Sequence, residues 1–434
     1  MDSGSETPCR PEPGRRAEGP APNQILVIPN RDEAPASHQT LVIPNRAEKP
    51  GEEPAFASPD LTPRTTKDTK YHEGVRFRRL LHAPSPSRFQ IGSAILSFMD
   101  AVTLTRQLVD IESISGNEAA VGNYLYGELC RVGYQTMKMP VEGDRFNVYA
   151  TSPEHPHPAV VLSTHMDTVP PFIPSSEDAG RIYGRGSCDA KGIIAAQVAA
   201  AERLQQQNVH VGLLFVVGEE RDSLGAKVAN DYVARGEVSG CRFLVNGEPT
   251  ENHIALASKG TLRVEVTAKG RMAHSAYPEL GESAIDKLIP ALTRLRAMPL
   301  PSDPEVGPCT LNIGLIEGGR APNVIPDYAH ADLLYRLVGP SDDLRKQIPA
   351  TAGEQVEVTF PLELPFLRLR TVDGLPTMIA AFTTDIPKLT KWGDPLLIGP
   401  GSIHVAHTGG EYLEKKQLAE SIDLYCKIAK QLLA

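Results

Sequence analysis

The sequence has no long apolar run and no paired cysteine motif. None of its apolar segments reaches the roughly 18 residues needed to cross a bilayer, so we expect no membrane-spanning helix. No charged-then-apolar segment opens the chain, and we therefore expect no secretory signal. The six cysteines are scattered and form no Cys-x-x-Cys pair. This usage is typical of reduced thiols in a cytoplasmic protein rather than of a disulfide framework.

A basic patch is also missing. The formal net charge is −9, and the charges are spread along the chain. A nucleic-acid partner would require clustered Lys and Arg, so this composition argues against one. The Gly-x-Ser-x-Gly turn of a nucleophilic serine hydrolase follows none of the strand candidates. With 434 residues, 41% of them hydrophobic, the chain is nevertheless long and apolar enough for a sizeable core.

The first 98 residues differ in composition from the rest. They hold 14 of the 38 prolines, and residues 25–31 are echoed by residues 40–46. Two copies are too few for a solenoid, and the proline content resists regular structure, so we expect residues 1–98 to be a disordered tail. Because folded-looking sequence begins directly after Met99, a second interpretation is that Met99 is the natural start.

From Asp100 onward, strand and helix patterns alternate. Apolar residues recur at helical spacing over 104–111 and 121–129, and short apolar runs at 159–163, 209–217 and 242–245 alternate with helical segments at 192–204 and 223–233. This rhythm predicts an α/β domain with a largely parallel sheet and helices on both faces.

The pattern changes around residue 258. Apolar and polar residues alternate over 261–268, as in a half-exposed antiparallel strand. A helix (281–296), two strands (310–316 and 328–338), a helix near Asp342 and a strand (356–360) complete a β-α-β-β-α-β order, which fits an inserted α+β, ferredoxin-like domain. We therefore predict a larger domain over 99–257 and 364–434, and an inserted domain over 258–363.

Polar clusters follow the apolar strand candidates. In open α/β sheets, ligands bind at the carboxyl ends of the strands. The clusters hold imidazole and carboxylate donors but no pair of thiolates: His165 and Asp167, Asp189, Glu219 and Glu220, Glu248, and His404 or His407. Such donors suit Zn²⁺, Co²⁺ or Mn²⁺. Two cations roughly 3.5–4 Å apart, bridged by one carboxylate, would lower the pKa of a shared water and polarise a carbonyl.

Each cluster also has an ordinary structural alternative. His165 and Asp167 could form a polar strand end, and Asp189 could cap the helix that follows it. Glu219 and Glu220 could lie in a solvated loop, although two acids after so apolar a strand are costly to bury without a cation. If their segment is extended, the two side chains point in opposite directions, so that one can bind metal while the other acts as general base.

The order of the motifs carries a resemblance. His-x-Asp, Asp-x-Lys-Gly, Gly-Glu-Glu, Gly-Glu-Pro and Gly-Pro-Gly followed by Ala-His resemble the co-catalytic metallopeptidase family of acetylornithine deacetylase, succinyl-diaminopimelate desuccinylase and carboxypeptidase G, over about residues 101–433. The resemblance implies two metal ions that share one ligand: His165, Asp189 and Glu248 for one ion, and Asp189, Glu220 and His407 for the other. It also implies that Glu219 is the general base and that Asp167 orients His165. Only this resemblance favours His407 over His404.

The inserted domain resembles the same family. His274 lies in a segment similar to one whose histidine, in dimeric members, reaches the neighbouring subunit's active site and stabilises the oxyanion. The resemblance implies that Asn323 contacts substrate and that Arg336 binds the substrate carboxylate, which suits its planar fork. A surface ion pair is the alternative for Arg336. A homodimer through the inserted domain is implied in the same way.

The run Asp-Ala-Lys-Gly, with Ala190 where many desuccinylases carry Met, looks closer to the acetylornithine and acetyl-lysine deacetylases. The leading hypothesis is therefore deacetylation of N-acetyl-ornithine or N-acetyl-lysine in arginine or lysine biosynthesis. The alternatives are succinyl-diaminopimelate or a C-terminal dipeptide as substrate, and a catalytically dead binding protein that kept the fold. Because every ligand candidate and Glu219 are present, we expect an enzyme that acts on an N-acyl amino acid or short peptide.

Overall fold

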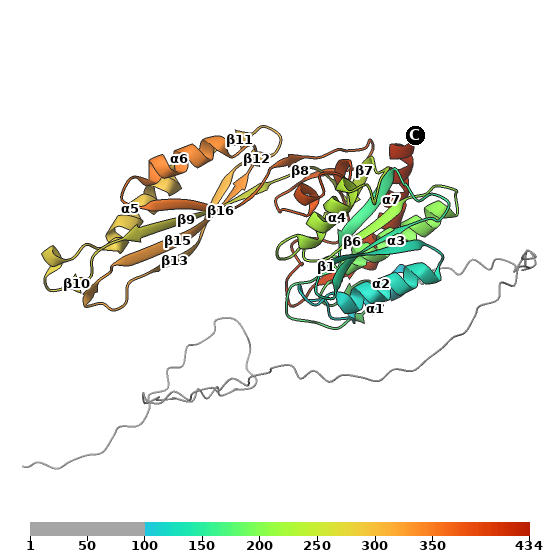
Figure 1. The fold of residues 1–434 in the computed structure, drawn as a ribbon, viewed down its shortest axis with the longest axis horizontal. Helices are drawn as coiled ribbons and strands as arrows, with labels where there is room; N and C mark the ends of the chain where they lie inside the picture. The colour runs from blue at the N-terminus through green and yellow to red at the C-terminus, as the bar shows by residue number, and fades with distance from the viewer. Residues whose placement is uncertain (1–99) are drawn as a thin grey trace, which may run out of the picture. The chain divides into compact units, whose positions relative to one another are not determined.

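The computed structural model describes residues 100–434. The expected tail over 1–98 and the suggested start at Met99 lie outside these residues. The described part holds a six-stranded sheet with its helices and a smaller four-stranded sheet with two helices (Figure 1).

The six-stranded sheet has the order β1-β2-β6-β3-β7-β19. Its strands are β1 (Gln135–Glu142), β2 (Arg145–Thr151), β3 (Val160–His165), β6 (Gly212–Val216), β7 (Phe243–Asn246) and β19 (Asp394–Leu397). Strands β6, β3, β7 and β19 run parallel, and the β1–β2 hairpin adds an antiparallel edge. All residues of β3 and β6 are buried, which explains why β6 and the first half of β3, Val160–Leu162, are continuously apolar rather than alternating. The predicted, largely parallel sheet is confirmed.

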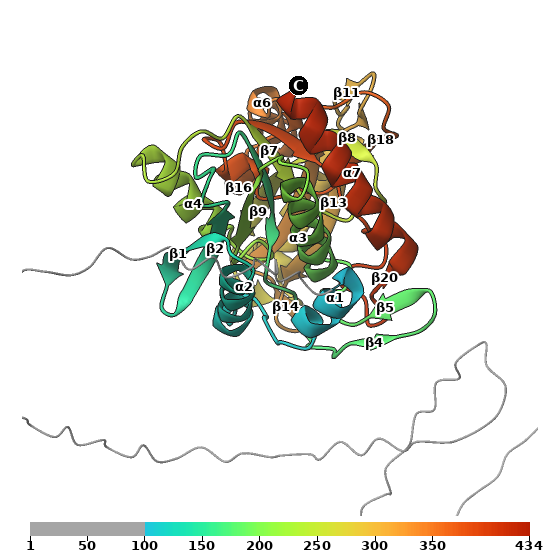
Figure 2. The ribbon, with the colours of Figure 1, turned by 90° about the vertical axis from the view of Figure 1, so that its right-hand side faces the viewer.

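Helices cover both faces of this sheet, as predicted (Figure 2). On one side a large core joins α1 (Ala101–Val109), α2 (Ala119–Arg131), α3 (Lys191–Gln205) and α7 (Lys415–Leu433). On the other side a smaller core joins α4 (Leu224–Ala234) and Trp392. Neighbouring residues of β6 divide between the cores, Leu213 in the first and Leu214 in the second, because strand side chains alternate. No helix within residues 100–434 is long and apolar enough to cross a membrane.

The four-stranded sheet has the order β13-β15-β9-β16, and all neighbours are antiparallel. Its elements follow one another as β9 (Gly260–Lys269), α5 (Ala284–Ala297), β13 (Thr310–Gly318), β15 (Tyr328–Leu337), α6 (Asp342–Ala352) and β16 (Glu357–Leu364). This order confirms the predicted β-α-β-β-α-β, ferredoxin-like arrangement. Every second residue of β9 from Leu262 to Ala268 enters the core under α5 and α6.

Several short strands were not predicted. A three-stranded sheet joins β17 (Leu367–Arg368), β8 (Ile254–Ser258) and β18 (Thr377–Ala380) where the chain enters and leaves the four-stranded sheet. A second three-stranded sheet joins β20 (Tyr412–Glu414), β5 (Arg181–Tyr183) and β4 (Ser176–Glu177). The remaining short elements are β10 (Ala273–His274), β14 (Val324–Ile325), β11 (Ser302–Asp303), β12 (Gly307–Pro308), η1 (Pro278–Leu280) and η2 (Ile386–Lys388). Segments of two to five residues are too short to show a period.

Candidate active site

Three predicted residues meet at the carboxyl ends of neighbouring parallel strands. His165 is the last residue of β3, Glu220 lies on the turn after β6, and Glu248 lies two residues beyond the end of β7. Because β3 pairs in parallel with both β6 and β7, their carboxyl ends share one edge of the sheet. His407 joins them from the loop that follows β19.

The residues form two groups that share Asp189. The ligand atoms of His165, Asp189 and Glu248 lie within 4.8 Å of one another, and so do those of Asp189, Glu220 and His407. Asp189 Oδ1 is 2.9 Å from His165 Nε2, and Oδ2 is 3.4 Å from His407 Nε2. The two oxygens of Asp189 therefore face different histidines, as those of a bridging carboxylate do. His404 belongs to neither group.

A helix-capping role for Asp189 is not what the structure shows. The N-cap of α3 is Ala190, and no side chain caps this helix end. Asp189 also does not follow a strand of the six-stranded sheet, as predicted, because its loop lies between β5 and α3, and β5 belongs to a small sheet. The expectation that each polar cluster follows an apolar strand of the large sheet is therefore wrong for Asp189.

The chemistry of the two groups fits divalent cations. Glu248 Oε1 is buried and has no hydrogen-bond partner among the described residues. Burial raises the pKa of the Glu248 carboxyl well above its ordinary value, since few groups nearby compensate its charge. Burial opposes a charge on His165, but bonds to Asp167 and Asp189 outweigh it and raise the pKa of His165 well above its ordinary value. A bound cation would compensate the charge of the Glu248 carboxylate and take the place of the proton on His165. The nitrogen and oxygen donors of the two groups suit zinc, cobalt or manganese.

Asp167 links the two acids after β6 to His165. The ring Nδ1 of His165 lies 3.0 Å from the backbone carbonyl oxygen of Asp167 and 3.6 Å from its Oδ1. The carboxylate of Asp167 accepts the backbone N–H of Glu219 on Oδ1 and that of Glu220 on Oδ2, both at 3.1 Å. Ser115 Oγ donates a further hydrogen bond to Oδ2 at 2.7 Å. Asp167 therefore contacts both the ligand candidate His165 and the backbone of Glu219, the candidate base.

Glu219 and Glu220 lie in a turn, not in an extended segment as assumed. Gly218 has a φ of 79°, which glycine adopts without strain, and its carbonyl accepts the N–H groups of Asp222 and Ser223 at 3.0 and 2.7 Å. The turn places Glu220 in a ligand group and leaves Glu219 outside both. Burial, together with the charge of Glu248, raises the pKa of Glu219 well above its ordinary value.

Glu411 holds the Asp189 loop and was not recognised from the sequence. Its Oε1 accepts the backbone N–H groups of Gly186, Cys188 and Asp189 at 2.9, 3.1 and 3.1 Å. Its Oε2 accepts a hydrogen bond from Arg185 Nη1 at 2.5 Å, and both side chains are buried. A single acid after two glycines has no sequence signal for this role, because only the pairing of β20 with β5 brings it to the loop.

Asp385 is a second acid that the sequence analysis missed. It is fully buried at the start of η2, and burial raises its pKa to about 7. Its charge adds to the raised pKa of both Glu219 and Glu248. The polar run Thr383-Thr384-Asp385 after β18 follows the same strand-end pattern as the predicted clusters, and could have marked it.

The residues singled out in the inserted domain lie in two places: His274 and Asn323 in or beside the small sheet of β10 and β14, and Arg336 in the four-stranded sheet. His274 pairs with Val324 across β10 and β14, and the Ser275 N–H donates to the Asn323 carbonyl at 3.0 Å, so His274 and Asn323 are exposed neighbours. Arg336 pairs with Thr261 near the start of β9. The eight residue steps of β9 between Thr261 and Lys269 span about 27 Å.

Arg336 is half-buried, and it does not form the surface ion pair that was the alternative to a substrate-binding role. Its Nη1 donates to Thr261 Oγ1 at 2.8 Å, and no acid among residues 100–434 forms a salt bridge with it. Burial lowers the pKa of its guanidinium. Arg336 therefore keeps hydrogen-bond donors for a ligand.

Comparison with known proteins gives the family. The peptidase dimerisation domain model matches residues 256–355. A probable carboxypeptidase of Aspergillus terreus is 38% identical over 377 residues, covering 77% of this chain and 87% of that protein. A peptidase M20 domain-containing protein of Schizosaccharomyces pombe is 38% identical over 336 residues, covering 75% of this chain and 82% of that protein.

Solved structures show the same fold. An aminopeptidase, PepT, from Bacillus cereus superimposes with a TM-score of 0.65 at 21% identity, covering 77% of this chain and 98% of that chain. An M20 family metallo-carboxypeptidase from Sulfolobus solfataricus gives a TM-score of 0.61 at 18% identity, covering 77% of this chain and 99% of that chain. The predicted fold class and hydrolytic activity are thereby confirmed, and the chain belongs to the M20 peptidase family, as a hydrolase of amide bonds.

Proposed function

We propose that this chain is a two-metal carboxypeptidase that releases an amino acid with a free α-carboxylate from a short peptide. The observation that carries the proposal is the position of Asp189, whose two oxygens face separate three-ligand groups. The proposal is supported by the relatives named as probable carboxypeptidases.

The chain offers three ligands for each of two ions. His165, Asp189 and Glu248 would hold one, and Asp189, Glu220 and His407 the other. Zinc is our first choice, with cobalt or manganese also compatible with these donors. When bound, the ions would lower the pKa of a water molecule and polarise the scissile carbonyl. The five cysteines of residues 100–434 are free thiols, which supports a reducing, cytoplasmic compartment.

Glu219 is suited to move the proton. It lies beside a metal-ligand candidate but outside both ligand groups, and Asp167 fixes its backbone. Burial raises its pKa above that of an ordinary carboxyl, and a general base is most effective when its pKa lies near the pH at which the enzyme works. The Glu219 carboxylate takes a proton from the attacking water and passes it to the nitrogen of the leaving amine.

The inserted domain, which we place at residues 258–363, supplies the substrate contacts. Arg336 keeps free donors and suits a bidentate grip on a carboxylate. Arg336 pairs with Thr261 near one end of β9, whereas His274 and Asn323 follow the other end of β9, about 27 Å away along the strand, so we infer that one copy of the domain does not bring all three to one substrate. We therefore assign Arg336 to the same subunit as the metal site, and His274 and Asn323 to a partner, where His274 stabilises the oxyanion.

The edge strand β13 is our choice for the dimer contact. It borders the four-stranded sheet and has no neighbour on its outer side within residues 100–434. Leu315 and Ile316 on this strand are 41% and 61% exposed. An unpaired edge with exposed apolar side chains is a template for pairing with a second chain.

Deacetylation is the second candidate. The Asp189-Ala190-Lys191-Gly192 run and the segment around His274 favour an N-acetylated basic amino acid, which would place the enzyme in arginine or lysine biosynthesis. The same residues would act in both reactions, because each substrate presents an amide next to a carboxylate that Arg336 can bind.

A substrate panel tests the function. Metal-stripped protein is reloaded with Zn²⁺ or Co²⁺ and offered dipeptides and tripeptides, the same peptides with amidated C-termini, N-acetyl-ornithine, N-acetyl-lysine and succinyl-diaminopimelate. We expect hydrolysis of peptides with a free C-terminus and little of their amides. Glu219→Gln should keep its metal and lose about 10²–10⁴-fold in kcat. Equal hydrolysis of the amidated peptides, or full activity in excess chelator, would refute the proposal.

A further inference from the structure

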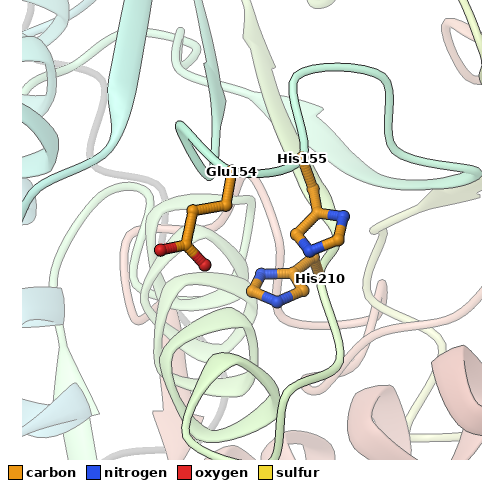
Figure 3. Close-up of side chains that lie close together, drawn as sticks. All are labelled: Glu154, His155 and His210. Atoms are coloured by element: carbon orange, nitrogen blue, oxygen red, sulfur yellow. The ribbon is translucent and has the colours of Figure 1, made fainter.

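A third group of metal-ligating side chains lies away from the active site. Within residues 100–434, three groups of His, Cys or acidic side chains gather their ligand atoms within 4.8 Å, and two of them are the halves of the active site. The third group is Glu154, His155 and His210 (Figure 3). It is as closely gathered as the two groups that share Asp189.

The topology separates this group from the active site. Glu154 and His155 lie in the loop between β2 and β3, and His210 lies two residues before β6. The pairing of Ala150 in β2 with Leu213 in β6 brings these two segments together. The group thus lies where β3 and β6 begin, whereas the active site lies where they end. Five or six residues of strand place about 17–20 Å between the two sites.

The imidazole rings of His155 and His210 are stacked, and the ring nitrogens of His210 have little hydrogen bonding. The His155 and His210 ring centroids are 3.9 Å apart with 22° between the planes. His210 Nδ1 is buried and has no hydrogen-bond partner in the described part of the chain, and Nε2 has there only a long contact of 3.4 Å to Asn208 Oδ1. Figure 3 shows the Glu154 carboxylate beside the His210 ring. An unpartnered imidazole nitrogen with an adjacent carboxylate is an incomplete polar cluster that an ion would complete.

The electrostatics of the group also suit a cation. Glu154 forms no salt bridge within residues 100–434, so its charge is not compensated by a basic side chain there. Two imidazoles and one carboxylate form a donor set that suits zinc, with the remaining position left to water.

The backbone on both sides is preformed. The His155 N–H donates to the Ser152 carbonyl at 2.9 Å, closing the loop, and Asn208 has a φ of 58° that turns the chain into β6. On a tetrahedral zinc the ligand atoms lie roughly 3.4 Å apart, given metal–nitrogen bonds near 2.0–2.1 Å. The ligand atoms of the three side chains lie within 4.8 Å of one another, so binding zinc requires the two imidazole rings to rotate out of their stack until both lone pairs point at the ion.

We propose that Glu154, His155 and His210 bind one zinc ion, additional to the two of the active site. The ion joins the β2–β3 loop to the start of β6. It is a structural ion, because it lies at the opposite edge of the sheet from the catalytic residues. The proposal is independent of which amide the active site cleaves.

Metal counting tests the proposal on the active enzyme. Bound zinc is measured by elemental analysis, and the protein carrying its catalytic ions is then titrated with Zn²⁺ by calorimetry. The test variant is His155→Gln combined with His210→Gln. The matched control is His157→Gln, because His157 lies in the same loop but bonds to Ser239 Oγ at 3.1 Å instead.

We expect three zinc ions in the wild type and in the control, two in the double variant, and unchanged kcat/KM in all. A double variant that binds as much zinc as the wild type overturns the proposal, and so does a wild type that stops at two. Electron paramagnetic resonance of Cu²⁺ added to wild-type protein that carries only its two active-site zinc ions gives a check that needs no variant. Hyperfine lines from two imidazole nitrogens are expected, and a spectrum without nitrogen coupling overturns the site.

Discussion

The Asp167 carboxylate accepts the backbone N–H of Glu219 at 3.1 Å. Its other oxygen accepts the neighbouring N–H of Glu220 at the same distance, and its backbone carbonyl lies 3.0 Å from the ring of His165. One buried acid therefore positions the proposed base, one ligand of each ion and the turn between them. In this geometry the carboxylate orients the Glu219–Glu220 turn, while the backbone of Asp167 orients the imidazole.

Asp167→Asn should slow the reaction about 10–100-fold, the range for partners that orient metal ligands. The amide keeps one acceptor oxygen, so one of the two N–H groups on the turn would face an NH₂ donor. The measurement is kcat/KM together with zinc content. Ser115→Ala is the control, because it removes only one hydrogen bond to the same carboxylate. An Asp167→Asn enzyme no slower than Ser115→Ala would mean that other contacts hold the turn.

Glu411→Gln should destabilise the protein by about 3–5 kcal/mol, because it leaves the buried Arg185 without its counter-charge. Zinc affinity should fall as well, since Glu411 holds the loop of Asp189. Urea unfolding of the metal-free protein measures the first effect. Glu414→Gln is the control: its pair with Arg181 is 3.3 Å long and 42% exposed on both sides, so about 1 kcal/mol at most is expected. An equal loss of unfolding free energy in Glu411→Gln and Glu414→Gln would contradict the proposed role of Glu411 as the buried partner of Arg185.

Zinc affinity should rise with pH. In the metal-free fold, bonds to Asp189 and Glu220 raise the pKa of His407 from 6.5 to about 10. The protonated ring stabilises that fold fully below pH 6.5, and this contribution disappears as the pH rises toward 10. Zinc must displace this proton, so its apparent Kd should fall by about tenfold per pH unit within the window.

Chelator competition at pH 7, 8 and 9 measures this dependence. His407→Gln should bind zinc more weakly and with a flatter dependence on pH, whereas His404→Gln, outside both ligand groups, should leave the slope unchanged. The same slope in His407→Gln and wild type would show that the proton is displaced from another group.

Two inactive variants should restore activity when combined. If His274 acts on the partner's site, Glu219→Gln and His274→Ala each lack activity, but a mixed dimer contains one site with both residues intact. After subunit exchange, an equal mixture should regain about a quarter of wild-type kcat, because half of the dimers are mixed and half of their sites are complete. A mixture that stays inactive after confirmed exchange would place His274 in its own subunit's site or outside catalysis.

Ile316→Lys should yield a monomer that keeps its zinc and loses activity. The side chain is 61% exposed on the edge strand β13, and a charge there opposes pairing with a second chain. Sedimentation velocity and zinc content measure the two effects. Lys346→Glu, a change at an exposed position on α6, is the control and should remain dimeric. A dimeric Ile316→Lys protein would exclude β13 as the contact.

The large elements were predictable because their periods are long enough to read. The apolar runs of β3, β6 and β7 indicated buried parallel strands, and the polar residues that follow these runs include the ligand candidates His165, Glu220 and Glu248. The hairpin of β1 and β2 escaped because polar and apolar residues are mixed in both strands, so that neither forms a continuous apolar run. Short strands such as β5 and β20 escaped because few residues carry their pattern. Glu411 and Asp385 were missed for another reason. A single acidic residue gives no sequence pattern, and its role becomes visible only when the residues that surround it in the fold are known.

The sequence by itself determined which residue types stand at which strand ends, because hydrophobic periodicity and burial act within a few neighbouring residues. Only the tertiary structure decided how those ends combine. It placed Asp189 between two histidines through a loop held by Glu411, and it brought His407 rather than His404 beside Asp189 and Glu220. It also folded Glu219 and Glu220 into a turn on Asp167, and put His274 and Arg336 in two different sheets of the inserted domain. These relations join segments up to more than 200 residues apart, such as Asp189 and Glu411. They follow from strand pairing and buried hydrogen bonds, which local sequence patterns do not encode.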